Sequence, residues 1–199
     1  MMSTSLPFRQ TLSFDDVLLA PKYSEIESRS EIDLSSSISD YNFSLPIISS
    51  PMDTVTESAM SVTVANHGGL GVVHRYNTIS EQAAIIRQIY SKVEAVSAAV
   101  GVTGRFVERA IAAHTSGAKF ICIDVAHGHH SNVERAIKSI KDSVIGDSVH
   151  LIAGNVAMPE AFIDLSKWGA DAIRVGIGGG SICSTRIQTG HGVPTFQSI

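Results

Sequence analysis

Short apolar runs alternate with longer amphipathic stretches along most of this chain. Runs of this kind are typical of strands buried on both faces of a parallel sheet. They cover residues 45–49, 70–74, 95–100, 120–125, 149–153 and 172–175. The amphipathic stretches between them predict helices, and Pro159 stands at a favourable first helical position. The clearest of these stretches are 80–91, 104–116, 132–142 and 159–168.

Polar or glycine-rich residues follow the ends of most predicted strands. The carboxyl ends of parallel strands meet on one face, and a ring of such residues is how a (β/α)8 barrel builds its active face. The ring comprises Ser50 to Asp53, His74 with Arg75, Asp124 with His127 to His129, Gly154 with Asn155, and the loop after Val175. A doubly wound sheet is the alternative, but its glycine fingerprint fails because Ser181 stands where the third glycine belongs. We therefore predict an α/β fold of the TIM-barrel type, with residues 1–199 forming one domain.

The predicted barrel is incomplete. About six strands are found, whereas a (β/α)8 barrel has eight and typically about 250 residues. The first and sixth strands would then present unpaired edges, which proteins normally cover or pair. We expect a C-terminally truncated barrel: a fragment, a shortened open reading frame, or a chain completed by another chain. Ahead of the barrel, weak alternation between Lys22 and Asp40 predicts a short surface hairpin.

The composition is that of an ordinary globular protein. Of 199 residues, 44% are hydrophobic and 17% are charged, and the net charge is −4 without a run of Lys or Arg. This charge argues against nucleic acid as the main partner and favours a small ligand. Residues 1–10 lack an apolar signal core, and no apolar run approaches the roughly 18–20 residues of a membrane span. We expect a cytoplasmic protein with no membrane association.

The two cysteines are too few for a disulfide framework. Cys122 lies within an apolar run, where cysteine usually acts as a small hydrophobe. Cys183 instead follows a cluster of glycines at 176, 178, 179 and 180, in a loop directly after a predicted strand. Glycines let main-chain N–H groups approach a ligand, and a loop rich in donors lowers the pKa of a thiol. Cys183 is therefore the candidate nucleophile, and the alternative is a glycine-rich turn with an incidental cysteine.

The sequence Gly-Ile-Gly-Gly-Gly-Ser-Ile-Cys-Ser-Thr-Arg at 176–186, with Thr-Gly-His-Gly-Val-Pro at 189–194, resembles the active-site loop of the IMP dehydrogenase and GMP reductase family. It departs from the family at Gly179, where proline is usual, and at Ser184, where threonine is common. Leu12 to Pro21 is similar to the opening motif of the same family. The resemblance implies the N-terminal three quarters of the catalytic barrel, without the inserted pair of regulatory CBS domains.

The resemblance also implies a purine-nucleotide oxidoreductase that reacts through a covalent cysteine adduct. Cys183 would attack C2 of the purine, and Thr185 would help to position water or ammonia. Substrate contacts are expected at Ser50, Met52, Arg174 and Ser181, the last two facing its anionic part. Contacts with the dinucleotide or its site are implied for Asp53, Asp124 and Asn155. Main-chain carbonyls of Gly178, Gly180 and Cys183 are implied ligands of a monovalent cation, K+.

Several of these residues have simpler interpretations that stay open. Asp53 has the position of a helix cap, and Asn155 that of a turn residue. Asp124 ends an apolar strand, where a carboxylate is costly unless a ligand or a donor awaits it. Arg186 is also consistent with a surface ion pair. Three neighbouring histidines suggest zinc, namely His127, His129 and His130. No carboxylate or thiolate at metal-ligand spacing supports this interpretation.

Two reactions share this chemistry. A dehydrogenase would convert IMP, NAD and water into XMP and NADH, whereas a reductase would convert GMP and NADPH into IMP and ammonia. The lack of an insert between His74 and Val93 is usual for the reductase, but 98–102 and 191–194 look more like the dehydrogenase, which we therefore favour. The resemblance implies a homotetramer once the barrel is complete. A hypothesis of another class is a non-catalytic fragment that binds nucleotide or a longer homologue.

Overall fold

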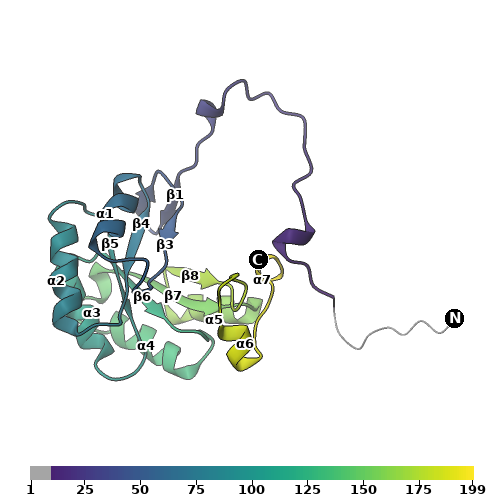
Figure 1. Ribbon diagram of the computed structural model, residues 1–199. Coiled ribbons are helices and arrows are strands. Elements are labelled where there is room, and N and C mark those ends of the chain that lie inside the picture. The colour runs from purple at the N-terminus through teal and green to yellow at the C-terminus, as the bar shows by residue number, and fades with distance from the viewer. Residues whose placement is uncertain (1–9) are drawn as a thin grey trace, which may run out of the picture.

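A computed structural model describes residues 10–199 and contains a sheet of six parallel strands. The strands follow one another in chain order, and the sheet curls into a half-barrel (Figure 1). They are β3 (Ile48–Ser49), β4 (Leu70–Val73), β5 (Val96–Val100), β6 (Phe120–Asp124), β7 (His150–Val156) and β8 (Ala172–Val175). The prediction of an incomplete barrel with about six strands is confirmed. Of residues 1–10, where the sequence predicts no signal core, all but Gln10 lie outside the described residues.

Helices follow the strands and cover the outer side of the sheet (Figure 1). They are α1 (Ser58–Asn66), α2 (Ile79–Tyr90), α3 (Phe106–Thr115), α4 (Ser131–Lys141) and α5 (Pro159–Trp168). Helices α2 to α5 agree with the predicted ranges to within two residues, and Pro159 does begin α5. The sequence does not single out α1, because its mix of small and β-branched residues has no apolar stripe. Within the described residues, no helix is long and apolar enough to cross a membrane.

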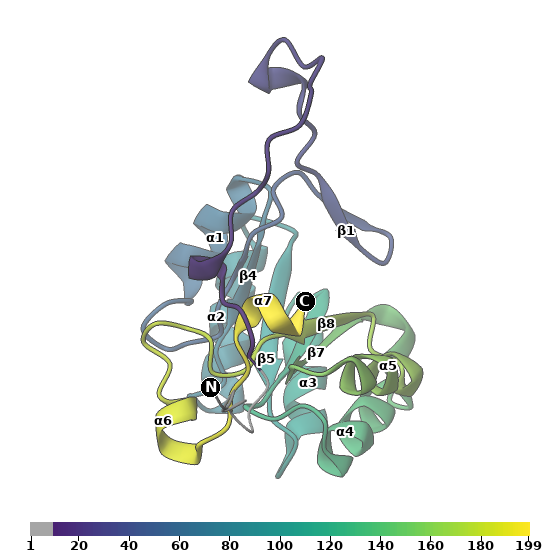
Figure 2. The same cartoon turned by 90° about the vertical axis from the view of Figure 1, so that its right-hand side faces the viewer.

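Two further short helices follow β8. They are α6 (Thr185–Thr189) and α7 (Thr195–Ser198), and they lie at the β8 end of the sheet, apart from α2, α3 and α4 (Figure 1). The ring of Phe14, in the 3-10 turn η1 (Phe14–Asp16), packs edge-on against Phe196 of α7 with 5.6 Å between centroids. The same proximity of η1 and α7 is visible from the side in Figure 2. The two ends of the described chain therefore meet beside the sheet.

The predicted hairpin exists but lies further along the chain than expected. It pairs β1 (Ser36–Ile38) with β2 (Tyr41–Phe43), so the prediction of its position within 22–40 is wrong. Earlier apolar residues of that segment are exposed, and the chain there runs as an arm with one more 3-10 turn, η2 (Arg29–Glu31) (Figure 1). The hairpin forms where Phe43 can be buried, with its ring 5.7 Å from that of Phe120 on the sheet. The position of the hairpin is therefore set by where Phe43 can be buried.

Alternate residues of the strands from β4 to β8 face two different cores. Ile121 and Ile123 of β6 point toward the helices and join the larger core. Phe120 and Cys122 point to the inner face, where the hairpin packs on them. Because side chains alternate along a strand, Asp124 shares the inner face with Cys122. The strand ends thus carry polar residues into the hollow side of the half-barrel.

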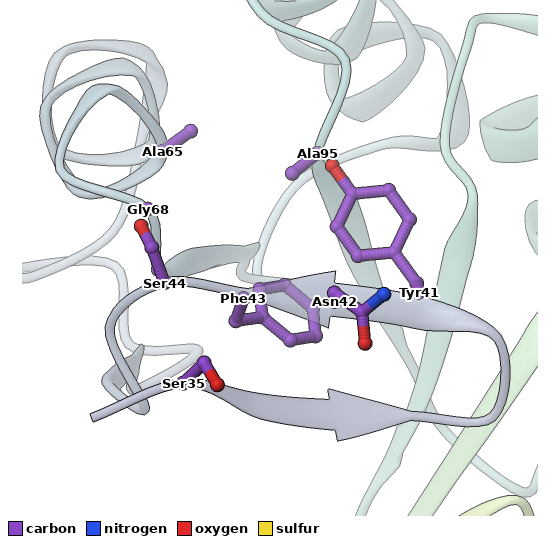
Figure 3. A pocket seen from close by; sticks show the side chains of 9 residues that line it. Ser35, Tyr41, Asn42, Phe43, Ser44, Ala65, Gly68 and Ala95 are labelled. Atoms are coloured by element: carbon purple, nitrogen blue, oxygen red, sulfur yellow. The ribbon is translucent and has the colours of Figure 1, made fainter. Parts of the chain in front are cut away.

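A cavity of about 340 Å³ lies between the hairpin and the sheet (Figure 3). Tyr41 and Phe43 of β2 line it, together with Ala65 of α1 and Ala95 before β5. These residues lie at the amino ends of β4 and β5, the side opposite to the strand ends that carry the polar residues. This cavity is therefore a gap beneath the hairpin and not part of the candidate site.

Candidate active site

Asp124 and Arg174 form an ion pair on the inner face of the sheet. Arg174 is the third residue of β8, and its Nη1 lies 2.5 Å from Oδ1 of Asp124, the last residue of β6. Both side chains are largely buried: 29% of the surface of the Arg174 side chain is exposed and 18% of that of Asp124. The donor that a carboxylate at this strand end requires is therefore supplied by the protein itself. Arg174 is thus paired with Asp124 in this structure, and its expected contact with an anionic ligand stays a prediction.

Cys122 is the unreactive cysteine of the pair. It is fully buried, and its Sγ lies 3.8 Å from Nη1 of Arg174. Burial raises the pKa of Cys122 to about 11, although the charge of Arg174 opposes the rise. A fully buried thiol with this pKa stays protonated at neutral pH, which argues against a nucleophilic role for Cys122.

The loop that carries Cys183 is closed by main-chain pairing and tied to the neighbouring strand. Ile177 and Val193 form an isolated antiparallel bridge, with the N–H of Val193 donating to the carbonyl of Ile177 at 3.0 Å. Asn155, at the end of β7, donates its side-chain N–H to the carbonyl of Gly176 at 2.9 Å. Asn155 is therefore more than a turn residue, because it anchors the first residue of the loop.

Cys183 sits half-buried within this loop, at a place that favours its thiolate. Hydrogen bonding from the hydroxyl and N–H of Thr185 lowers the pKa of Cys183, and the charge of Arg186 and the N–H of Gly178 act in the same direction. A hydrogen bond to the charged form is a direct way to stabilise a thiolate. Of the two cysteines, Cys183 alone combines exposure with a lowered pKa.

Two of the three carbonyls predicted to bind K+, those of Gly178 and Gly180, are already hydrogen-bonded. Nη1 of Arg186 donates to the carbonyl of Gly178, and it donates to that of Gly180 at 2.7 Å. The carbonyl of Gly180 also accepts from the N–H of Cys183 at 3.1 Å. The residues in this arrangement do not fit K+, because a cation would have to displace Arg186. Arg186 is also not the surface ion pair that the sequence left open, since its partners are carbonyls.

The turn after β3 is well anchored, while its predicted ligand-binding residues are exposed. Ser50, Met52 and Asp53 all face solvent. Fully buried Thr56 donates its hydroxyl to the carbonyl of Ser50 at 2.6 Å and so fixes the turn. Asp53 does not cap a helix, because α1 begins at Ser58 and the residue at its N-cap is Glu57.

The structure connects only some of the predicted site residues. Hydrogen bonds join the ends of β6, β7 and β8 through Asp124, Asn155 and Arg174. The exposed turn residues Ser50, Met52 and Asp53 have no hydrogen bond or ion pair to the Cys183 loop among the described residues. Ser181 is exposed beside Gly180 and likewise makes no side-chain hydrogen bond within that part of the chain. All of them nevertheless follow the carboxyl ends of their strands.

Two of the three histidines of the 127–130 segment have structural partners. Nε2 of His129 lies 3.1 Å from Oδ2 of Asp164 on α5. Nδ1 of His130 accepts the N–H of Asn132 and so caps α4. These contacts explain two of the three histidines without zinc.

A pocket of about 410 Å³ with three arginines lies after β4 and β5, and the sequence analysis does not predict it. Among the described residues, Arg75 has no carboxylate partner, and its Nε is buried without a hydrogen bond. Arg109 bonds only to neutral acceptors, on Asn77 and Gln82. Burial, and then the charge of Arg75, lower the pKa of Arg109. Two guanidiniums without a counter-charge favour an anionic ligand.

The third arginine of this pocket has its own partner. Arg105 forms an ion pair with Glu108 in the first turn of α3, and both side chains are exposed. The signal that could have revealed the pocket is the position of Arg75 and Arg105, each shortly after a strand end.

Comparisons with known proteins find similar sequences over almost the whole chain. A family described as "IMP dehydrogenase / GMP reductase domain" matches residues 11–199. A GMP reductase of Variovorax paradoxus is 35% identical over 190 residues, which cover 94% of this chain and 57% of the relative. A GMP reductase of Leptothrix cholodnii is 38% identical over the same coverage. An inosine-5'-monophosphate dehydrogenase of Nitrosopumilus maritimus is 28% identical over 319 residues, covering 98% of this chain and 67% of the relative. The chain thus spans somewhat more than half the length of the reductases that it matches.

Proposed function

Since the chain belongs to the IMP dehydrogenase/GMP reductase family, we propose that it supplies the nucleophilic part of a purine-nucleotide oxidoreductase site, with Cys183 as the nucleophile. The observation that carries the proposal is the contrast between the two cysteines. Cys183 is accessible with a lowered pKa, while Cys122 is buried with a raised one. The thiolate of Cys183 attacks C2 of the purine, and Thr185, next to it, positions the small molecule that leaves or enters.

The sequence pattern alone favours the dehydrogenase, but the arginine pocket leads us to favour the reductase direction. The thiolate displaces ammonia from C2 of GMP, a hydride from NADPH then reduces the adduct, and the C–S bond breaks to release IMP. The net reaction consumes two protons and yields ammonium and NADP. The unpartnered Arg75 and Arg109 support it, because NADPH carries one more phosphate than NADH. The identity to GMP reductases points the same way.

The dehydrogenase is the second candidate. Residues 98–102 and 191–194 resemble that enzyme, and the dehydrogenase of Nitrosopumilus maritimus aligns with nearly the whole chain. Here the thiolate adds to C2 of IMP and a hydride leaves C2 for NAD; water then adds to C2 and the C–S bond breaks, giving XMP, NADH and a proton. Absorbance at the reduced nicotinamide band separates the two reactions, because GMP with NADPH loses absorbance and IMP with NAD gains it.

A covalent trap tests the shared step without turnover. A purine nucleotide with chlorine at C2 should react with the thiolate of Cys183, forming the C–S bond while chloride leaves. Mass spectrometry should find the nucleotide on Cys183 only, IMP should slow the reaction, and Cys183→Ala should abolish it. A label on Cys122, or an unchanged rate in the presence of IMP, would argue against the proposal.

A further inference from the structure

Arg186 lies at the centre of the Cys183 loop. Its Nη1 donates to the carbonyls of Gly178 and Gly180, so one positive group collects two main-chain oxygens from the same loop. Oxygen atoms that converge on a positive charge are the arrangement that proteins use to hold a metal cation. In this loop the positive charge is the guanidinium of Arg186 and not a bound metal ion.

The backbone around Arg186 leaves room for its side chain. Gly178 adopts φ 75°, and a Cβ at this residue would lie 3.2 Å from Cβ of Arg186. A Cβ at Gly192, on the other strand of the loop, would lie 3.3 Å from the same atom. Glycines therefore flank the arginine on both sides, and any larger residue would crowd it.

We infer that the guanidinium of Arg186 is the built-in cation of this loop, in the place that the family resemblance gives to K+, and that Cys183 is held for reaction without a bound monovalent ion. The inference rests on the proposed role of Cys183 and concerns what orders its loop. The carbonyl of Gly180 accepts from both Arg186 and Cys183, which uses both of its lone pairs. A side chain tethered within the loop also has a high effective concentration there, which a free ion must overcome.

The same arginine links the order of the loop to the charge of the nucleophile. The positive charge of Arg186 adds to the hydrogen bonds from Thr185 in lowering the pKa of Cys183. Loss of Arg186 therefore has two expected effects: the carbonyls of Gly178 and Gly180 lose their donor, and the thiolate loses a favourable charge. Arg186 is a positioning residue, since it acts through the loop.

The test measures alkylation of Cys183 in the 199-residue chain by iodoacetamide, a neutral reagent that is not attracted to the arginine. The reaction is followed by mass spectrometry in KCl and in tetramethylammonium chloride at equal ionic strength. Tetramethylammonium is too large to be held by two neighbouring carbonyls. The rate for the unaltered protein should be the same in both salts, and a faster rate in KCl would overturn the inference.

Arg186→Met keeps the apolar stem and removes the charge and donors. Its Cys183 should react roughly three- to tenfold more slowly, the change in thiolate fraction expected when a neighbouring charge is removed. KCl should then restore part of the rate, because the freed carbonyls can take the ion. Arg29→Met, in the N-terminal arm, is the matched control and should leave the rate unchanged. A rate equal to that of the unaltered protein in Arg186→Met would overturn the inference.

Cys122 reports whether each variant stays folded. It is fully buried, so iodoacetamide reaches it only when the sheet opens. If Arg186→Met exposes Cys122, Arg186→Lys is used instead, and its rate should remain independent of KCl because the positive charge is kept. A KCl-dependent rate in Arg186→Lys with Cys122 protected would also count against the inference. The readout is alkylation, so its outcome is separate from the nucleotide trap that tests the proposed function.

Discussion

Arg174 reaches Asp124 across an intervening strand because that strand has glycine at the crossing point. Asp124 of β6 is in register with Gly154 of β7, and Gly154 is in register with Arg174 of β8. A Cβ at Gly154 would lie 2.7 Å from Cβ of Arg174 and 2.8 Å from its carbonyl oxygen. Gly154 therefore leaves space for the Arg174 side chain to cross β7. The ion pair between Arg174 and Asp124 connects the ends of β8 and β6 across β7.

Gly154→Ala should weaken the end of the sheet. The added methyl group overlaps Arg174, and crowding of this kind in a packed region typically costs about 1–3 kcal/mol. Urea denaturation of the variant should show a lower midpoint with an unchanged slope. Gly101→Ala is the control, because this glycine has no left-handed φ and a Cβ there would make only ordinary contacts, the nearest at 3.4 Å. An unchanged midpoint for Gly154→Ala would show that the crossing tolerates a side chain.

The ion pair itself can be measured by a double-mutant cycle. Asp124→Ala or Arg174→Met alone leaves a largely buried partner charge, so each should lose about 1–3 kcal/mol of unfolding free energy. The double variant should lose less than the sum, with a coupling of about 1–2 kcal/mol, since neither charge is then left alone. Strictly additive losses would mean that the contact is not energetically important. The partial exposure of Arg174 keeps the estimate below that for a dry pair.

The sequence was most informative where burial alone decides structure. Strands from Leu70 onward and helices from Ile79 onward have clear apolar patterns, so their positions follow from the sequence. The hairpin was placed too early because isolated apolar residues such as Ile32 alternate without being buried. Only contact with Phe120, far away in the sequence, shows why Phe43 is the residue that the hairpin buries.

Contacts between distant residues were beyond the sequence pattern. The positions of Asp124 and Arg174 at strand ends were predictable, but their pairing depends on register across β7 and on Gly154. The donor to the carbonyls of Gly178 and Gly180 depends on how the loop folds back, which no periodicity describes. Strand-end residues are thus identifiable from sequence, while the partner of each one is set by the three-dimensional fold.

The pH dependence of alkylation should separate the two cysteines. The thiolate is the reactive form, so a lowered pKa makes Cys183 reach its full rate at a lower pH than an ordinary cysteine. Cys122, with its pKa raised to about 11, should remain unmodified across the neutral range in the folded protein. Iodoacetamide labelling between about pH 6 and 9, with peptide mass spectrometry, measures both.

Thr185→Val tests the cause of the shift at Cys183. Valine keeps the shape of threonine and removes the hydroxyl that is part of the leading contribution, so the pKa of Cys183 should rise and its rate at neutral pH should fall. Ser184→Ala is the matched control, because this neighbouring hydroxyl does not contribute to the shift. Equal rate profiles for Thr185→Val and the unaltered protein would exclude the hydroxyl as the stabilising group.

The arginine pocket should contribute to binding of the phosphorylated dinucleotide. Arg75 is the residue to change, because its Nε is buried without a partner and its charge has no carboxylate to balance it. Arg75→Met should weaken NADPH binding by roughly 10- to 150-fold, the equivalent of about 1.5–3 kcal/mol for a charge-assisted hydrogen bond. Arg105→Met, whose exposed side chain already pairs with Glu108, should change the affinity less than about threefold. Calorimetric titration at two salt concentrations measures both variants, and the unaltered protein should lose more affinity with added salt than Arg75→Met does.

A loss of NADH binding as large as the loss of NADPH binding would assign Arg75 to the pyrophosphate that both dinucleotides share. This outcome would remove the support that the arginine pocket gives to the reductase direction.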